Sequence, residues 1–282
     1  MKNLLFAIVF AASPALVFTQ NLVVNPSFEI ENRPQRDCRF AGKDNELTQG
    51  CKGWNGFFQQ TADYHFYSPA TLNCSVPKPH SGTHALGLIC FHPRQNDYYH
   101  EHAQGSLSKP MERGKTYRLE FWTTQADSAG SHHIRRQCEG GATIRPVACN
   151  RLGVFFTVEP NPSQADFQAD ILNFELRPQV VFEEIITTKA GEWRKMEAIF
   201  KADKPYKFFT IGNFAADAVT ETMPKVSGEP ISHVEVGLGE KAVRPIAYYL
   251  FDDFLMEENL PKTDLAESLT KAKRYVFQKP AF

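Results

Sequence analysis

The sequence of residues 115–125 is KTYRLEFWTTQ, and its apolar and polar side chains alternate. Because successive side chains of a β-strand point to opposite faces, Tyr117, Leu119 and Phe121 would share one face, and Arg118 and Glu120 the other. This alternation is typical of a strand with one buried face, so a strand is predicted here.

The same two-residue period recurs in residues 193–201, which place Met196 and Phe200 on one face and Lys195 and Glu197 on the other. Clusters of Gly, Pro, Asn and Asp separate such runs, and helical periodicity is nearly absent before residue 262. Many strands joined by polar turns indicate an all-β sandwich or barrel. Further strands are predicted at residues 21–24, 83–91, 98–107, 152–159, 179–187, 206–214 and 246–257.

The first residues have the pattern of a secretory signal peptide. Lys2 supplies a positive start, residues 4–18 are almost wholly apolar, and polar sequence begins at Thr19. The alternative is a membrane anchor, but this run of about 15 residues is shorter than the roughly 20 that a spanning helix needs. We therefore expect residues 1–19 to be a signal peptide and the mature chain to be exported to the periplasm, the cell surface or the medium.

The composition limits the class of partner. The chain has 31 Lys and Arg against 32 Asp and Glu, a formal net charge of -1, which argues against nucleic acid. No segment after the signal peptide predicts a membrane-spanning helix. We expect one domain over residues 20–258 and a C-terminal tail over residues 259–282, in which Asp264 would cap a short helix.

An even number of cysteines in an exported chain predicts disulfides. The alternative is zinc ligation, but the sequence contains no Cys-x-x-Cys pair. Six cysteines allow 15 pairings, and sequence alone does not choose between them. We favour local pairs that would tie the long loops: Cys38–Cys51, Cys74–Cys90 and Cys138–Cys149.

Aromatic side chains gather in the loops. Sugar-binding proteins use aromatic faces to stack on pyranose rings and polar groups to fix the hydroxyls. The alternative is that these rings cover the ends of the sandwich. The candidate ligand-binding residues are Trp54, Phe57, Tyr64, Phe66, Tyr67, Tyr98 and Tyr99.

One carboxylate lies inside an apolar run. Alternation over residues 248–256 places Asp252 on the same face as Phe254 and Met256, and the run contains no Lys or Arg. A buried carboxylate is costly unless it is paired or binds a cation, and Ca²⁺ prefers oxygen ligands. The alternative is that Asp252 accepts hydrogen bonds from backbone N–H groups.

Three separated segments carry a family resemblance: Asn-Pro-Ser-Phe-Glu at residues 25–29, His-Ser-Gly-Thr-His-Ala-Leu at 80–86, and Phe-Asp-Asp-Phe at 251–254. In order and spacing they resemble the signatures of galactose-binding-like jelly rolls, an architecture that many carbohydrate-binding modules share. The chain is most similar to versions in Bacteroidetes-type cell-surface proteins. The resemblance covers residues 21–257 and implies a jelly-roll β-sandwich.

The resemblance also implies a structural calcium ion that links the N-terminal segment to the last strand. Carried over to this chain, Glu29 and Asp252 would give carboxylate oxygens, and Ser27 and Ser81, or a residue next to Ser81, would give backbone oxygens. The loops here are longer and richer in Cys than in simple sugar-binding modules, which leaves the place of a sugar site open.

Catalytic signatures are absent from the sequence: it has no His-Glu-x-x-His, Gly-x-Ser-x-Gly, P-loop or dinucleotide fingerprint. Glu183 and Glu184 are adjacent, so a strand would point them to opposite faces, which disfavours a glycoside hydrolase pair. His100 and His102 are expected to be surface histidines. We expect a non-enzymatic module that binds a glycan; the alternative is a protein-interaction or structural subunit of a cell-surface complex.

Overall fold

The computed structural model describes residues 20–34, 46–56, 62–67, 77–93, 100–126, 143–160, 176–224 and 243–259. The predicted signal peptide and the tail from residue 260 onward therefore lie outside the described residues. So do several predicted site residues, namely Cys38, Phe57, Cys74, Tyr98, Tyr99 and Cys138.

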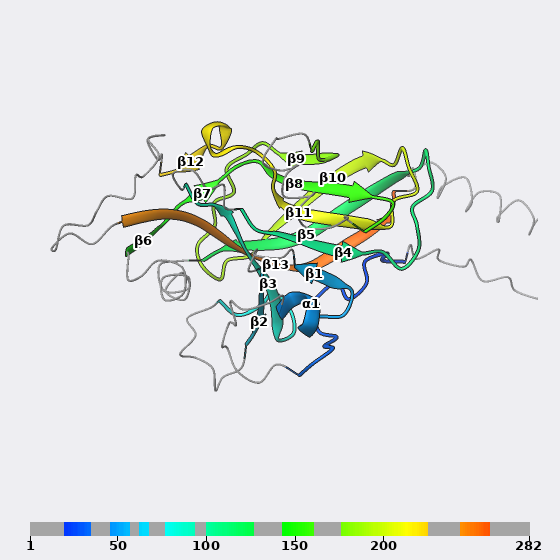
Figure 1. Ribbon diagram of the computed structural model, residues 1–282, viewed down its shortest axis with the longest axis horizontal. Helices are drawn as coiled ribbons and strands as arrows, with labels where there is room; N and C mark the ends of the chain where they lie inside the picture. Colours follow the sequence, from blue (N-terminus) through cyan, green and yellow to red (C-terminus); the bar gives the residue numbers. More distant parts are fainter. Residues whose placement is uncertain are drawn as a thin grey trace, which may run out of the picture.

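Two sheets lie face to face and form a β-sandwich (Figure 1). The five-stranded sheet has the order β1 (Trp54–Gly56), β4 (His102–Ser106), β11 (Phe208–Asn213), β8 (Leu152–Thr157) and β9 (Val180–Phe182). The six-stranded sheet has the order β10 (Arg194–Lys201), β5 (Thr116–Gln125), β13 (Val243–Glu258), β3 (His84–Phe91) and β2 (Asp63–Phe66), with β6 (Thr143–Pro146) beside β13.

Every neighbouring pair in the two sheets is antiparallel except β6 with β13. A small sheet pairs β7 (Ala148–Cys149) with β12 (Thr222–Met223). The short helices are α1 (Glu46–Gly50) and a 3-10 turn, η2 (Asp217–Val219).

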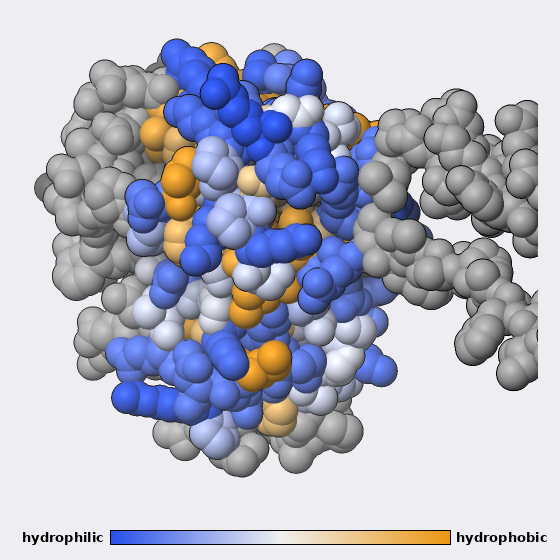
Figure 2. All heavy atoms as spheres, turned by 90° about the vertical axis from the view of Figure 1, so that its right-hand side faces the viewer, coloured by the Kyte–Doolittle hydropathy of each residue, from blue (hydrophilic) through white to orange (hydrophobic). Residues whose placement is uncertain are grey.

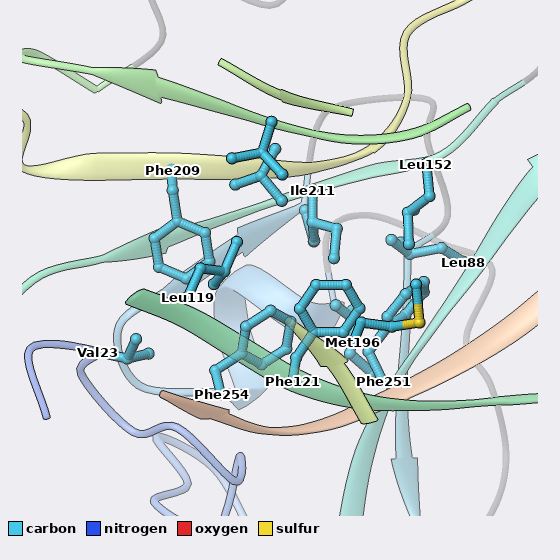
Figure 3. Packing of buried hydrophobic residues seen from close by; sticks show 14 of the residues in the cluster. Val23, Leu88, Leu119, Phe121, Leu152, Met196, Phe209, Ile211, Phe251 and Phe254 are labelled. Carbon is cyan, nitrogen blue, oxygen red and sulfur yellow. The ribbon is translucent and has the colours of Figure 1, made fainter. Parts of the chain in front are cut away.

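The core fills the space between the sheets. Figure 3 shows Phe209 and Ile211 of β11 pointing toward Phe121 of β5 and Phe254 of β13. The rings of Phe121 and Phe254 stack with centroids 5.3 Å apart. Burying each such ring stabilises the fold by about 1.5–3 kcal/mol. Side chains that face outward are mostly hydrophilic on the side of the molecule drawn in Figure 2, where hydrophobic patches are small.

The alternation that predicted β5 and β10 is confirmed. Tyr117, Leu119 and Phe121 are buried, and Met196 and Phe200 of β10 pack into the same cluster. The strands predicted near residues 83–91, 152–159, 206–214 and 246–257 form as β3, β8, β11 and β13, and shorter strands form within 98–107 and 179–187.

The prediction of a strand at residues 21–24 is wrong, because this segment links the two sheets instead of extending one. Leu22 N–H donates to Met256 O at 2.7 Å in the six-stranded sheet, and Val24 N–H donates to Ser106 O at 2.9 Å beside the five-stranded sheet. Only one bridge, between Val23 and Leu107, has the pairing of a strand.

A β-bulge changes the face of Asp252. The register between β13 and β5 shifts between Asp252 and Leu255, and Asp253 has a φ of 48°. Phe251 and Phe254 therefore both enter the core although they are three residues apart. The prediction that Asp252 shares a face with Phe254 is wrong: its carboxylate points to the turn at residues 80–84.

Cys51, Cys90 and Cys149 are buried free thiols, and no disulfide is seen within the described part of the chain. The predicted partner of each one lies outside the described residues, so the pairing stays a prediction. No helix within the described ranges is long and apolar enough to cross a membrane.

Candidate functional site

The turn at residues 80–84 brings the N-terminal segment and the last strand together. Asp252 Oδ2 accepts the Ser81 N–H at 2.9 Å, and Asp252 Oδ1 accepts the Asp253 N–H at 2.7 Å. Gly82 has a φ of 57°, a left-handed conformation that L side chains rarely adopt. A Cβ at Gly82 would also collide with the Glu29 carboxylate, so only glycine suits this turn.

Asp252 is a carboxyl group that the described residues do not neutralise. Its side chain is fully buried, and none of the described Lys, Arg or His side chains forms an ion pair with it. Burial raises its pKa to about 8, and the two backbone N–H donors lower the pKa too little to offset burial and the neighbouring Asp253 charge. At neutral pH this carboxyl holds a proton unless a cation replaces it.

Glu29 is held by the same turn. Its Oε1 accepts the N–H groups of Thr83 and His84, both at 2.8 Å, and its Oε2 accepts the Thr83 hydroxyl at 2.9 Å. Burial raises the pKa of Glu29, but these hydrogen bonds outweigh burial and the net pKa is lowered. Glu29 is therefore an anion that fastens the N-terminal segment to the turn.

The four predicted calcium ligands are brought into one region only in part. Glu29 and Asp252 both contact the turn, and the Ser81 N–H donates to Asp252, so only the oxygens of Ser81 could bind a cation. Ser27 lies in the turn that follows Asn25, whose φ is 54°. No group of three or more His, Cys, Asp and Glu side chains converges as a metal site within the described residues.

Two of the predicted ligand-binding rings belong to the core, which corrects the prediction. Trp54 is 1% exposed, its Nε1–H donates to Asn25 O at 3.0 Å, and its ring packs against Phe254. Tyr64 is 1% exposed, and its hydroxyl donates to Phe28 O at 2.7 Å. Because both rings are buried, neither has a face open to a sugar. The sequence did not show this, since an aromatic ring at the start of a strand can equally well pack at the end of a core.

Phe66 and Tyr67 remain accessible candidates at the end of β2. Both are partly exposed, the Phe66 ring contacts His84 with centroids 5.2 Å apart, and Tyr67 N–H donates to Thr83 O at 2.7 Å. They therefore lie next to the turn that binds Glu29. The candidates Phe57, Tyr98 and Tyr99 lie outside the described residues.

A row of polar and aromatic side chains crosses the outer face of the five-stranded sheet. Asn55 of β1 pairs with Gln104 of β4, Gln104 pairs with Thr210 of β11, and Thr210 pairs with Phe155 of β8. The flanking residues of β4 and β11 are in the core, so alternation turns this row away from the core, although its central members Gln104 and Thr210 are only 3% and 0% exposed. We call Asn55, Gln104, Thr210 and Phe155 the polar row.

The amide of Gln104 is the unusual group in this row. The side chain is 3% exposed, and its Nε2 has no hydrogen-bond partner among the described residues. A buried donor without an acceptor costs about 1–3 kcal/mol, so such groups mark places where a ligand or water completes the site. Asn55 is exposed and Phe155 is partly exposed, so the two ends of the polar row face solvent.

The neighbouring histidines are buried, which corrects the expectation of surface histidines. His100 contacts Asn213 O at 3.0 Å, and His102 contacts the same oxygen at 3.1 Å. Burial lowers the pKa of His102 to about 3, so its ring is neutral beside Phe214, with the two ring centroids 4.7 Å apart. These side chains anchor the end of β11.

The adjacent acidic residues form separate ion pairs. Glu183 pairs with Arg151 at 2.8 Å, and Glu184 pairs with Arg194 at 2.6 Å. Both carboxylates are largely exposed, so they lack the protected, paired setting that glycoside hydrolysis requires.

Sequence reasoning missed the polar row. Its members are spread over residues 55–210, and each appears as a lone polar or aromatic residue within its own segment. Only the strand order β1-β4-β11-β8 makes them neighbours. The alternation of β4 was a usable signal, because it places Gln104 on the face away from Ala103.

Comparison with protein-family models finds no match, and comparison with curated proteins finds none either. Among solved structures, the chain is similar to TmCBM61 in complex with β-1,4-galactotriose, at 15% identity over 86% of this chain and 100% of that chain, with a TM-score of 0.34. It is similar to Family 16 Carbohydrate Binding Module-2 at 11% identity over 84% and 100% of the two chains, with a TM-score of 0.32.

A third similar structure is the cleaved adhesin domain of Lys-gingipain from Porphyromonas gingivalis. It is 10% identical over 74% of this chain and 92% of that chain, with a TM-score of 0.36. The structural neighbours thus include carbohydrate-binding modules and a bacterial adhesin domain. These likenesses are too distant to assign a ligand, so the function is argued from the residues of this chain.

Proposed function

We propose that this chain is an exported, non-catalytic module that binds a glycan through the polar row of the five-stranded sheet. The observation that carries the proposal is the buried Gln104 Nε2, which has no acceptor in the part of the chain that the structure describes. A sugar hydroxyl is an acceptor of the right size, and an amide can both donate to and accept from neighbouring hydroxyls.

The rest of the row supplies what a sugar ring needs. Phe155 offers a partly exposed aromatic face, and Asn55 offers a second amide at the other end. The row carries no charge, which suits an uncharged ligand. An oligosaccharide lying across the strands would replace the missing acceptor of Gln104, and that gain would add to its stacking on Phe155.

We further propose that a structural calcium ion binds at the turn of residues 80–84. The support is Asp252, a buried carboxyl group whose charge no described cation balances. Two carboxylates do not complete a calcium shell, so Ser27 and other turn residues would contribute carbonyl or hydroxyl oxygens, with water for the remainder. The ion would stabilise the link between the N-terminal segment and β13.

Export is part of the proposal and rests on the sequence of residues 1–19.

A glycan array with the mature chain, followed by calorimetry on the best neutral oligosaccharide, tests the binding function. We expect Gln104→Met to weaken binding by about 10–100-fold, because it removes one buried hydrogen bond worth about 1–3 kcal/mol. The same variant should leave the chain as stable as before or more stable, since it deletes a buried donor that has no partner.

The matched control is Gln49→Ala, which removes an exposed amide on α1 and should leave binding unchanged. Failure of every glycan to bind, together with specific co-purification of a cell-surface protein, would establish the alternative of a protein-interaction subunit. Loss of binding in Gln49→Ala as well as Gln104→Met would show that the polar row is not the site.

A further inference from the structure

Two of the three tryptophans lie together on the outside of the six-stranded sheet. Trp122 is on the outer face of β5, and Trp193 directly precedes β10; both are partly exposed, whereas Trp54 is in the core. His80 lies between them: its ring stacks on Trp122 with centroids 4.0 Å apart and planes at 14°, and it meets Trp193 edge-on at 5.9 Å. We call these three rings the outer aromatic cluster.

Hydrogen bonds hold the rings of His80 and Trp193 in place, and the Trp122 ring stacks on His80. His80 Nδ1 contacts Asp253 Oδ2 at 2.5 Å, and Ser81 Oγ donates to Asp253 Oδ1 at 2.7 Å. Trp193 Nε1–H donates to Lys78 O at 3.0 Å. The bulge in β13 gives Asp253 a left-handed backbone, and its carboxylate contacts the same turn as that of Asp252, through the Ser81 hydroxyl and the His80 ring. A ligand would therefore meet rings that are already ordered, which lowers the entropic cost of binding.

Polar side chains border the rings. The Asp253 carboxylate is 26% exposed, and the His80 side chain is 29% exposed. Lys195, directly across from Trp122 on β10, is 42% exposed. Lys195 also pairs with Glu120 at 3.4 Å and Glu197 at 3.5 Å. The border of the rings therefore holds one ammonium group and three carboxylates, which can bind hydroxyls as donor and acceptors.

We propose that the outer aromatic cluster is a second saccharide site, for neutral hexopyranose units, on the sheet opposite the polar row. This inference rests on the proposed glycan-binding function and makes the module bivalent. Pyranose rings carry apolar C–H faces that stack on indole and imidazole, while Asp253 and Lys195 bind the hydroxyls at the ring edge. Two sites on opposite faces would let one module join two glycan chains or bind one surface with avidity.

Tryptophan fluorescence and calorimetry test the second site with the mature chain. The probes are three neutral oligosaccharides, cellohexaose, β-1,4-galactotriose and mannohexaose. Binding at the cluster should shield Trp122 and Trp193 from acrylamide quenching, whereas buried Trp54 contributes little to quenching. We expect a stoichiometry of two for at least one probe, falling to one in Gln104→Met with the shielding retained.

Two variants address the cluster itself. Trp122→Leu removes the main stacking face and should reduce the stoichiometry from two to one. Lys195→Ala removes a partly exposed side chain together with its ion pairs to Glu120 and Glu197, so its unfolding midpoint is compared with that of the parent chain first. It should weaken the second site about 3–10-fold through one lost hydrogen bond. Ile199→Ala, at another exposed position on β10, is the matched control and should change nothing.

The outcomes separate this inference from the proposed function. A stoichiometry of one that Gln104→Met abolishes, with no shielding of the tryptophans, overturns the second site and leaves the proposed function intact. No binding and no shielding with any probe overturns both. Shielding that Trp122→Leu and Lys195→Ala reduce, and that Gln104→Met does not, supports the second site.

Discussion

Without calcium, the stability of this chain should fall as the pH rises from 5 to 8, because Asp252 must then lose its proton inside the protein. Its folded-state pKa is about 8, against 3.8 for an aspartate side chain in the unfolded chain. Since the folded-state pKa lies above the unfolded value, the protonated group contributes stability that is full below about pH 4 and is lost as the pH rises through about 8.

The magnitude follows from the shift. Each pKa unit corresponds to about 1.4 kcal/mol, so Asp252 by itself should lower the free energy of unfolding by about 4 kcal/mol between pH 5 and 8. The lowered pKa of the buried His102 acts in the opposite direction below pH 6.5 and should offset about 2 kcal/mol of this loss. For a domain of this size, the Tm should fall by on the order of 10 °C. Excess calcium should restore the lost stability at pH 8, because the ion binds the ionised carboxylate in place of the proton.

The assay is thermal or urea unfolding at pH 5, 6, 7 and 8 in excess EDTA and in excess CaCl₂. Apparent calcium affinity should rise about tenfold per pH unit in this range, because binding releases one proton. Asp252→Asn should remove the fall in stability with rising pH in EDTA, and the calcium effect with it. The matched control is Asp253→Asn, which changes a partly exposed neighbouring carboxylate and should keep most of the slope.

Equal pH slopes in the parent chain and Asp252→Asn, both in EDTA, would refute the assignment of the slope to this carboxyl. A slope that disappears in Asp252→Asn while calcium has no effect on the parent chain would confirm the buried acid and refute the metal site. These two results separate the physical chemistry of Asp252 from the calcium proposal.

Two further predictions concern the described contacts. Gly82→Ala should destabilise the chain by about 2–4 kcal/mol, because its Cβ would strain a left-handed φ and collide with Glu29. Gly114→Ala, at a φ of 87° with nothing near its Cβ, should cost only about 1 kcal/mol. Urea unfolding compares the two variants, and equal costs would contradict the role of the collision. Tyr248→Phe should lower the free energy of unfolding by about 1–3 kcal/mol, because it removes the hydroxyl that donates to Asp63 at 2.6 Å. An unchanged urea midpoint would show that this hydrogen bond makes no net contribution to stability.

The candidate site was predictable only where the pattern was local. Glu29 and Asp252 were found from their motifs, and both do contact the turn at residues 80–84. The side of the strand on which Asp252 lies was not predictable, because alternation assumes a regular strand and the bulge at Asp253 interrupts that regularity. The sequence around Trp54 does not distinguish a buried ring from an exposed one, and only the packing of Trp54 against Phe254 shows that it belongs to the core.

Sequence by itself determined the elements whose cause is local. The two-residue period of β5 and β10 identifies their buried faces, because neighbouring side chains of any strand must point in opposite directions. Tertiary structure alone decided the environments that depend on strand order. Ser81 and Asp252 are 171 residues apart, and the polar row unites four strands of one sheet. A residue acquires its pKa, its exposure and its partners from neighbours of this kind, and these neighbours exist only once the two sheets have packed.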